Sequence, residues 1–190
     1  MNRLDDPYVH PGTSILKNHF GITDPVNLDR IERSFVAQRI TEGVPSGALD
    51  LSHLQAIHRH LFQDIYEWAG EIRTVEINKG AQQFQFRQYI HTGMADVHRR
   101  LVRSRFLTGL SRQDFAQQVA VIIGDVNYIH PFREGNGRAQ LQYLKLLTER
   151  AGHPVDLARI DTKRWIEASQ VSHAADYALM ARLIAEAILK

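Results

Sequence analysis

The stretch HPFREGNGR, residues His130 to Arg138, decides how the chain folds. Pro131 cannot lie inside a helix, so a helix that reaches His130 must end there. Before the stretch, apolar residues recur at helical spacing, namely Phe115, Val119, Ile122, Ile123, Val126 and Ile129. After it comes a second helical stripe, formed by Leu141, Leu144 and Leu147. We therefore predict a short loop between two helices, opening onto the N-terminus of the second.

This loop carries groups that suit an anion and a metal ion. Gly135 and Gly137 allow the backbone to approach a ligand closely, and a helix N-terminus offers unpaired N–H groups and positive potential. Arg138 adds a guanidinium that can bind phosphate through two hydrogen bonds. Glu134 makes sense beside phosphate when Mg²⁺ lies between them. His130 is of the residue type that most often serves as a general base.

The same nine residues also have a structural interpretation. The stretch could be a helix–loop–helix turn with a buried histidine and a solvated Arg–Glu pair. The coincidence of so many chemically suited residues within nine positions favours a reactive site.

At these residues the chain resembles the Fic family, whose signature is HxFx[D/E]GNGRxxR. The match covers His130, Phe132 and residues 134–138, whereas Leu141 replaces the last arginine. The resemblance implies a mainly α fold, a Fic-type helical bundle with a small β-hairpin flap. It also implies transfer of AMP from Mg²⁺-bound ATP to a hydroxyl side chain of a target protein.

The resemblance implies a role for each matched residue. His130 is the catalytic base, and Glu134 is the Mg²⁺ ligand. Phe132 supports the loop from the core, together with Asn127, which matches an asparagine often found shortly before the motif. The nucleotide phosphates would be bound by Gly135, Asn136, Gly137 and Arg138.

A β-hairpin is predicted upstream of the loop. Ile72 to Ile77 alternates, Asn78 to Gly80 forms a turn signal, and Phe84 to Phe86 is the return strand. In the Fic family such a hairpin is a flap that holds the target by strand addition. The docking residues would then be Lys79, Gly80 and Phe84. The alternative is an ordinary exposed hairpin tip with one packing aromatic residue.

Periodicity and capping residues predict helices along the rest of the chain. These helices lie near Ser14, Leu28, Ser52, Ile90, Asp161 and Ala174. The Ser52 helix is predicted to start with a capping box and to stop near Gly70. Within it, His58 and His60 are two positions apart and cannot face one metal ion, so we expect them to be exposed or partly buried.

Length and composition fit a single domain of 190 residues. We divide it into an arm and helix over 1–50, a core with flap and loop over about 51–155, and C-terminal helices over 156–190. A net charge of +2 does not indicate a nucleic-acid binder. No cysteine is present, and no apolar segment suits a secretion signal or a membrane span. We expect a cytoplasmic protein with no membrane and no direct nucleic-acid contact.

Three functions stay open at this point. The first is a protein adenylyltransferase. The second is a related Fic-type transferase that moves a phosphoryl or phosphocholine group. The phosphorylating Doc branch has alanine and lysine at the two loop glycines, unlike Gly135 and Gly137. The third is a degenerate nucleotide-binding or interaction domain, which Leu141 supports and the intact His130 and Glu134 oppose.

The resemblance also suggests partners. Small bacterial members of the family often act as toxins on type II topoisomerases, so we expect such a protein target. The family's inhibitory helix has the pattern [S/T]xxxE[G/N]. In this chain Glu42 and Gly43 supply its end, but Gln38 stands at the Ser/Thr position. The resemblance therefore suggests a small antitoxin that supplies the helix in trans.

Overall fold

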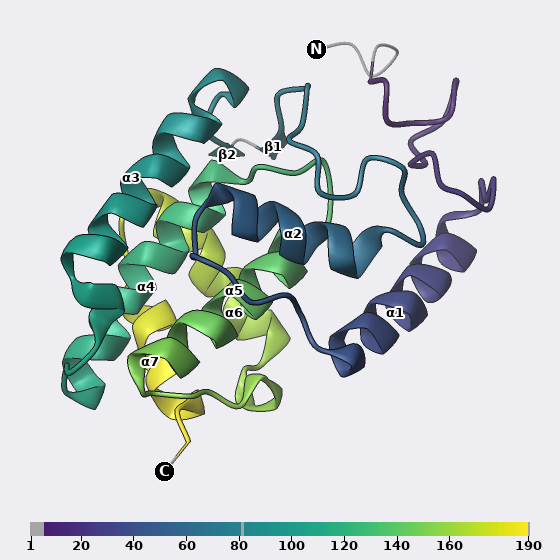
Figure 1. Ribbon diagram of the computed structural model, residues 1–190. Coiled ribbons are helices and arrows are strands. Elements are labelled where there is room, and N and C mark those ends of the chain that lie inside the picture. Colours follow the sequence, from purple (N-terminus) through teal and green to yellow (C-terminus); the bar gives the residue numbers. More distant parts are fainter. Residues whose placement is uncertain (1–5, 81, 190) are drawn as a thin grey trace.

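Helix α4, Arg112–Ile129, runs through the centre of the molecule (Figure 1). Its apolar residues are buried on more than one face, from Phe115 to Ile129. Ser111 caps the helix, because its hydroxyl oxygen accepts a hydrogen bond from the Asp114 N–H at 3.2 Å. The predicted helix is confirmed. We describe the protein from a computed structural model over residues 6–80 and 82–189.

Helix α5, Asn136–Ala151, follows the loop and ends at Gly152, whose φ is 85°. Five further α-helices occur within the described residues, namely α1 (Pro25–Glu42), α2 (Leu51–Phe62), α3 (Ile90–Arg103), α6 (Thr162–Val171) and α7 (Ala178–Ala187). In the same described part of the chain, four short 3₁₀ helices connect them, namely η2 (Arg87–Tyr89), η3 (Arg105–Leu107), η4 (Leu157–Arg159) and η5 (Ser172–Ala174).

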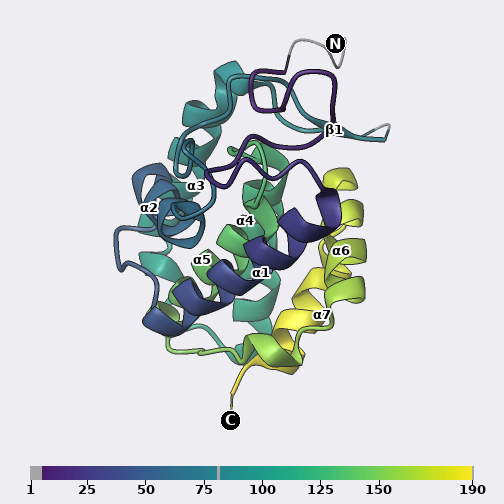
Figure 2. The same ribbon diagram turned by 90° about the vertical axis from the view of Figure 1, so that its right-hand side faces the viewer.

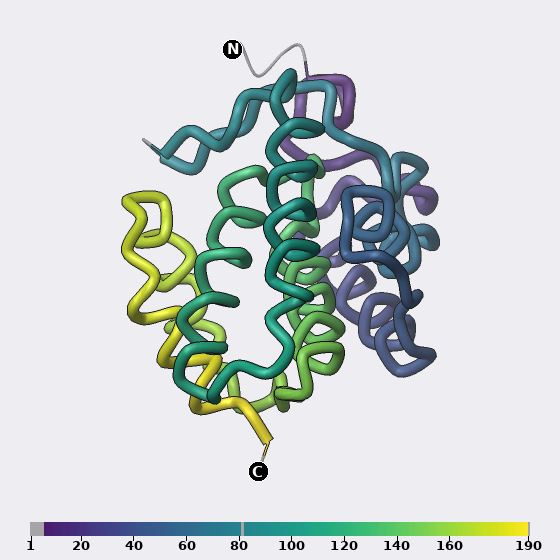
Figure 3. The backbone as a smooth tube through the Cα atoms, turned by 60° about the vertical axis from the view of Figure 1, so that its left-hand side comes forward, coloured from purple at the N-terminus to yellow at the C-terminus, as the bar shows by residue number. Residues whose placement is uncertain are grey.

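The helices are arranged around the α4–α5 pair. Figure 2 shows α1 crossing in front of this pair, with α6 and α7 to one side. Figure 3 separates α1 and α2 on one flank from α6 and α7 on the other. Helix α4 packs against α7, and α2 packs against α5. One hydrophobic cluster runs through all seven α-helices, so the predicted mainly α bundle is confirmed.

The two strands of the hairpin are shorter than predicted and lie only at its tip. Strand β1, Asn78–Lys79, pairs antiparallel with β2, Gln82–Gln83. Residues 72–77 and 84–86 are not strands, so these predicted bounds are wrong. The reason is that Arg73 ties its own segment to the end of α4, where its N–H donates to Pro131 O at 2.9 Å.

Three other predictions for the N-terminal half are wrong. No helix forms near Ser14; instead Val9 and Leu16 form an antiparallel bridge around a turn at Gly12, whose φ is 74°. The cap of α2 is Asp50 rather than Ser52, because the Asp50 carboxylate accepts from the His53 N–H at 2.8 Å. Helix α2 also ends at Phe62, well before Gly70.

Within residues 6–80 and 82–189, we find no helix with the length and apolar character that crossing a membrane requires.

Candidate active site

The backbone of the loop is fixed at both ends. His130 ends α4 with a φ of 47°, and Gly135 precedes α5 with a φ of 78°. Between them Asn136 clamps the turn: its Nδ2 donates to Phe132 O at 2.7 Å, and its Oδ1 accepts from Phe132 N at 2.9 Å. Ala139 N is the first amide to donate back into α5, at 3.1 Å to Gly135 O. The preceding N–H groups therefore lack helical partners.

A buried arginine that the sequence did not indicate as a site residue holds the loop from behind. The Arg73 side chain is 0% exposed. Its Nε donates to His130 O at 2.8 Å, its Nη1 donates to Val75 O at 2.8 Å, and its Nη2 donates to Gln85 O. Burial lowers the pKa of Arg73. One side chain thus joins the end of α4 to both bases of the hairpin.

His58 lies directly beneath the loop and is fully buried, so the prediction that it is exposed or partly buried is wrong. It is fully buried because it lies on the apolar face of α2 with Leu54 and Leu61. Its Nδ1 accepts from Gly70 N at 2.9 Å, and its Nε2 donates to Glu134 O at 2.9 Å. Burial lowers the pKa of His58 to about 3.

Phe132 is also fully buried, and it stacks on the His58 ring with centroids 3.9 Å apart. Asn127 is 7% exposed and joins α4 to α6, since its Nδ2 donates to Ser169 O at 2.9 Å. Both residues lie where a supporting role would place them.

His130 is buried and held in one tautomer. Its Nδ1 lies 3.1 Å from Asn127 O, an acceptor, so Nδ1 carries the proton and Nε2 has the free lone pair. The ring stacks on Phe84 with centroids 3.7 Å apart. Burial lowers the pKa of His130 to about 3, and the positive charges of Lys79 and Arg73 contribute. The imidazole is therefore neutral near pH 7.

A cavity of about 600 Å³ brings most of the predicted residues together. Its lining includes Lys79, Gly80, Phe84, Asn127, His130, Glu134, Asn136 and Gly137. Gly137 leaves open space, because a Cβ built on it would meet nothing within 4 Å. The cavity therefore combines a neutral histidine, a carboxylate and a helix N-terminus.

Arg138 and Gly135 do not line this cavity. The Arg138 guanidinium turns toward α1, where Nη1 lies 2.6 Å from the Glu32 carboxylate. Its Nη2 is 3.9 Å from Glu134, and its Cζ lies 4.7 Å from the Phe62 ring centroid. Gly135 packs so tightly that a Cβ there would lie 2.4 Å from Phe62.

One wall of the cavity is formed by α6 and η5, which the sequence motifs did not indicate as part of the site. It contributes five lining side chains, namely Trp165, Ile166, Ser169, Gln170 and His173. Trp165 is 5% exposed, and its Nε1–H has no partner among the residues that the structure describes. The helical spacing of these five residues was a usable signal, but nothing local indicated that they face the loop.

The hairpin covers the side of the cavity formed by Lys79, Gly80 and Gln82. Gln82 Nε2 donates to Gln170 O at 3.1 Å, which joins β2 to α6. Lys79 and Gly80 are exposed at the tip, whereas Phe84 is 4% exposed and packed on His130. Of the three predicted docking residues, only the first two therefore offer an accessible surface.

Glu134 could hold a metal ion only together with a ligand. Its side chain is 48% exposed at the cavity, and its Oε1 accepts from Gly135 N at 2.9 Å. Over residues 6–80 and 82–189, no cluster of three or more His, Cys, Asp or Glu side chains could form a protein cage. One carboxylate suits Mg²⁺ that takes its other ligands from phosphate and water.

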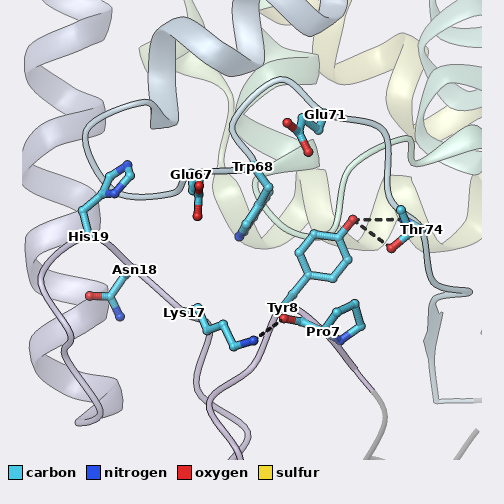
Figure 4. A pocket seen from close by; sticks show the side chains of 9 residues that line it. All are labelled: Pro7, Tyr8, Lys17, Asn18, His19, Glu67, Trp68, Glu71 and Thr74. Carbon is cyan, nitrogen blue, oxygen red and sulfur yellow. Dashed lines mark hydrogen bonds between the residues drawn. The ribbon is translucent and has the colours of Figure 1, made fainter.

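A second cavity, of about 470 Å³, lies against the N-terminal arm (Figure 4). Tyr8 Oη accepts from Thr74 N at 3.0 Å at one side, and Lys17 Nζ donates to Pro7 O at 2.8 Å. No residue of the HPFREGNGR loop lines it. We therefore take the first cavity as the candidate active site.

Known proteins resemble this chain along nearly its whole length. The family model of the Fic/DOC family matches residues 48–147. "Probable protein adenylyltransferase y4lH" of Sinorhizobium fredii is 38% identical over 95% of this chain and 94% of its own length. Protein adenylyltransferase VbhT of Bartonella schoenbuchensis is 36% identical over 95% of this chain, which spans 38% of VbhT.

Solved structures show the same fold. BepC from Bartonella tribocorum, crystallised with bound AMPPNP, has a TM-score of 0.86 at 27% identity over 96% of both chains. An N-terminal Fic domain from Bartonella quintana with bound ADP has a TM-score of 0.87 at 27% identity, covering 96% of this chain and 94% of that one. The loop, the hairpin over it and these relatives lead to one conclusion: the chain belongs to the Fic/DOC family.

Proposed function

We propose that this protein is a protein adenylyltransferase, which transfers AMP from ATP to a hydroxyl side chain of a target protein. The observation that carries the proposal is His130, a buried neutral histidine whose Nε2 is free beside the N-terminus of α5. Relatives named protein adenylyltransferase support the reaction, and BepC with bound AMPPNP supports the nucleotide.

The triphosphate would lie at the N-terminus of α5, over Gly137 and Asn136, where unpaired N–H groups and the helix dipole favour anions. His130 Nε2 takes the proton from the target hydroxyl, whose oxygen attacks the α-phosphorus. A new P–O bond forms there, the bond to the β-phosphate oxygen breaks, and pyrophosphate leaves. Catalysis rests on positioning and on electrostatic stabilisation.

The low pKa of His130 fits this cycle. Burial and nearby positive charges hold the imidazole neutral before the nucleotide binds, so it can accept a proton. A bound triphosphate brings negative charge into the same cavity, which stabilises the imidazolium and raises the pKa again. His130 would thus become a stronger base when ATP is in place.

Glu134 is the residue that would hold Mg²⁺, and the bound ion would offset negative charge on the phosphates. Gly135, Asn136, Gly137 and Arg138 complete the proposed phosphate site, the first two chiefly through the shape of the loop. In a Glu134→Ala variant we expect ATP affinity to fall and to lose most of its dependence on Mg²⁺. Calorimetry with and without Mg²⁺ checks this, and identical affinities in both proteins would contradict the assignment.

The hairpin is the proposed docking site for the target. Its backbone groups at Lys79 and Gly80 are exposed over the cavity, so an extended target segment could add beside them as a strand. Phe84 would not contact the target but would hold the His130 ring in place by stacking on it.

We further propose the role and the partners that the resemblance suggests. The protein would act as a toxin, with a type II topoisomerase as its target and a small antitoxin as an inhibitor in trans. A chain without cysteine suits a reducing cytoplasm. Purified type II topoisomerases, offered as acceptors, would test the proposed target.

We also propose that residues 1–190 act as one domain, because α1 and α6 contribute to the site from outside residues 48–147.

Paired labelling tests the reaction itself. A cell lysate receives the protein with ATP labelled either at the α-phosphate or at the γ-phosphate. Adenylylation predicts that only the α label reaches protein. Transfer of the γ label alone would show phosphorylation instead, and transfer of neither label would favour phosphocholine transfer or a domain without chemistry.

A further inference from the structure

A chain of polar contacts runs from α1 to the active-site loop. Tyr66 Oη donates to one carboxylate oxygen of Glu32, and Arg138 Nη1 lies 2.6 Å from the other. Arg138 Nη2 then lies 3.9 Å from Glu134, at the edge of the cavity. Glu32 belongs to a helix that the family model does not include.

This arrangement is fixed rather than loose. The Glu32 side chain is only 9% exposed, so removing its cationic partner would leave a buried charge uncompensated. Burial and the neighbouring Glu32 raise the pKa of Tyr66, so its hydroxyl keeps the proton that it donates. The Phe62 ring covers one face of the guanidinium. Separating the Arg138 guanidinium from Glu32 in order to contact a ligand is therefore unfavourable in free energy.

We propose that Glu32 is a positioning residue for nucleotide binding, an inference that rests on the proposed function. Glu32 binds Nη1 of Arg138 and so holds its Nη2 3.9 Å from Glu134, at the edge of the cavity where the nucleotide phosphates are proposed to lie. Without Glu32 the arginine regains rotamer freedom and can close directly on Glu134, the carboxylate proposed for the metal. Both changes weaken the site for a phosphate ligand.

The test is a Glu32→Gln variant, which keeps the size of the side chain and removes its charge. The dissociation constant of Mg²⁺-ATP, measured by calorimetry, is expected to rise about tenfold, a typical consequence of releasing one long side chain. Glu32→Asp should recover part of the affinity. In an Arg138→Gln background, which removes the positioned group, adding Glu32→Gln should cause no further loss.

A matched control separates positioning from stability. Asp64→Asn weakens a different ion pair that joins α1 to the rest of the protein, in which Arg39 Nε lies 2.6 Å from Asp64, and does not touch Arg138. We expect both variants to lower the melting temperature and only Glu32→Gln to weaken ATP binding. Equal affinities in wild type and Glu32→Gln, or equal losses in both variants, would overturn the proposal. Tighter binding would show instead that Glu32 competes with phosphate for Arg138.

The two claims can fail separately. A wild-type protein that binds ATP but transfers no α label would refute the proposed function, while the calorimetric comparison would still decide the role of Glu32. Normal α-label transfer with an unchanged dissociation constant in Glu32→Gln would refute only the positioning role.

Discussion

Gly135 and Gly137 look equivalent in the sequence but occupy different environments. Gly135 has a φ of 78° and packs against Phe62 and His58, whereas Gly137 faces open space in the cavity. An alanine at 135 would be strained in its backbone and would also overlap the Phe62 ring. An alanine at 137 would meet only a ligand.

We therefore predict opposite results for the two alanine variants. Gly135→Ala should lower the free energy of unfolding by about 2–4 kcal/mol, the sum of left-handed strain and overpacking. Gly137→Ala should leave stability nearly unchanged and weaken ATP binding. Chemical denaturation and calorimetry measure the two effects. Equal stability of both variants would contradict the structural distinction.

The loop residues could be predicted from the sequence because their types and spacing are local. The environment of their side chains could not. Arg138 turns to Glu32, which is distant in sequence and reaches it only through the packing of α1. Arg73 and His58 are polar residues whose type indicates exposure, yet tertiary hydrogen bonds keep both buried. Such partners cannot be read from one segment.

At the scale of elements, the hairpin is the part whose function depends most on its backbone. Deleting residues 78–82 should abolish labelling of the target, because strand addition needs the tip. Binding of ATP should be largely spared, since the loop, α5 and α6 remain. Labelling and calorimetry on the same preparation check both points. Normal labelling by the deletion variant would show that the hairpin does not dock the target.

The helices of the bundle could be predicted because apolar residues at helical spacing both indicate a helix and form the face that packs in the core. Helix α4, from Phe115 to Ile129, is an example. The hairpin was predictable in existence but not in extent. The β-branched residues before its tip indicate a strand, but Arg73 pulls that segment to the end of α4 instead. A competing tertiary contact therefore overrode the local strand preference.

For the whole molecule, two buried histidines predict sensitivity to acid. The pKa values of His58 and His130 are both lowered to about 3 from 6.5, so below pH 6.5 the unfolded chain binds protons that the folded protein does not. Above pH 6.5 protonation of these histidines does not reduce the free energy of unfolding. As the pH drops from 6.5 toward 3, this free energy falls, because only the unfolded chain takes up the protons. Each histidine should reduce stability by up to about 1.4 kcal/mol per pH unit in that window.

Comparing wild type with His58→Gln isolates this effect from the titration of carboxylates. The variant should be less stable at pH 7, because it loses packing against Phe132. Its stability should nevertheless decline less steeply between pH 6.5 and pH 4. Denaturant titrations across this range measure both slopes. Parallel slopes would mean that His58 is not buried in its neutral form.

The central claim is that His130 acts as the base of an AMP transfer. The measurement that tests it most directly is the initial rate of α-label transfer from ATP to protein by His130→Ala. Its matched control is His91→Ala, which removes an exposed histidine of α3. We predict a loss of about 10²–10⁴-fold for His130→Ala, with ATP affinity retained, and no change for the control. A wild-type rate in His130→Ala would contradict the account.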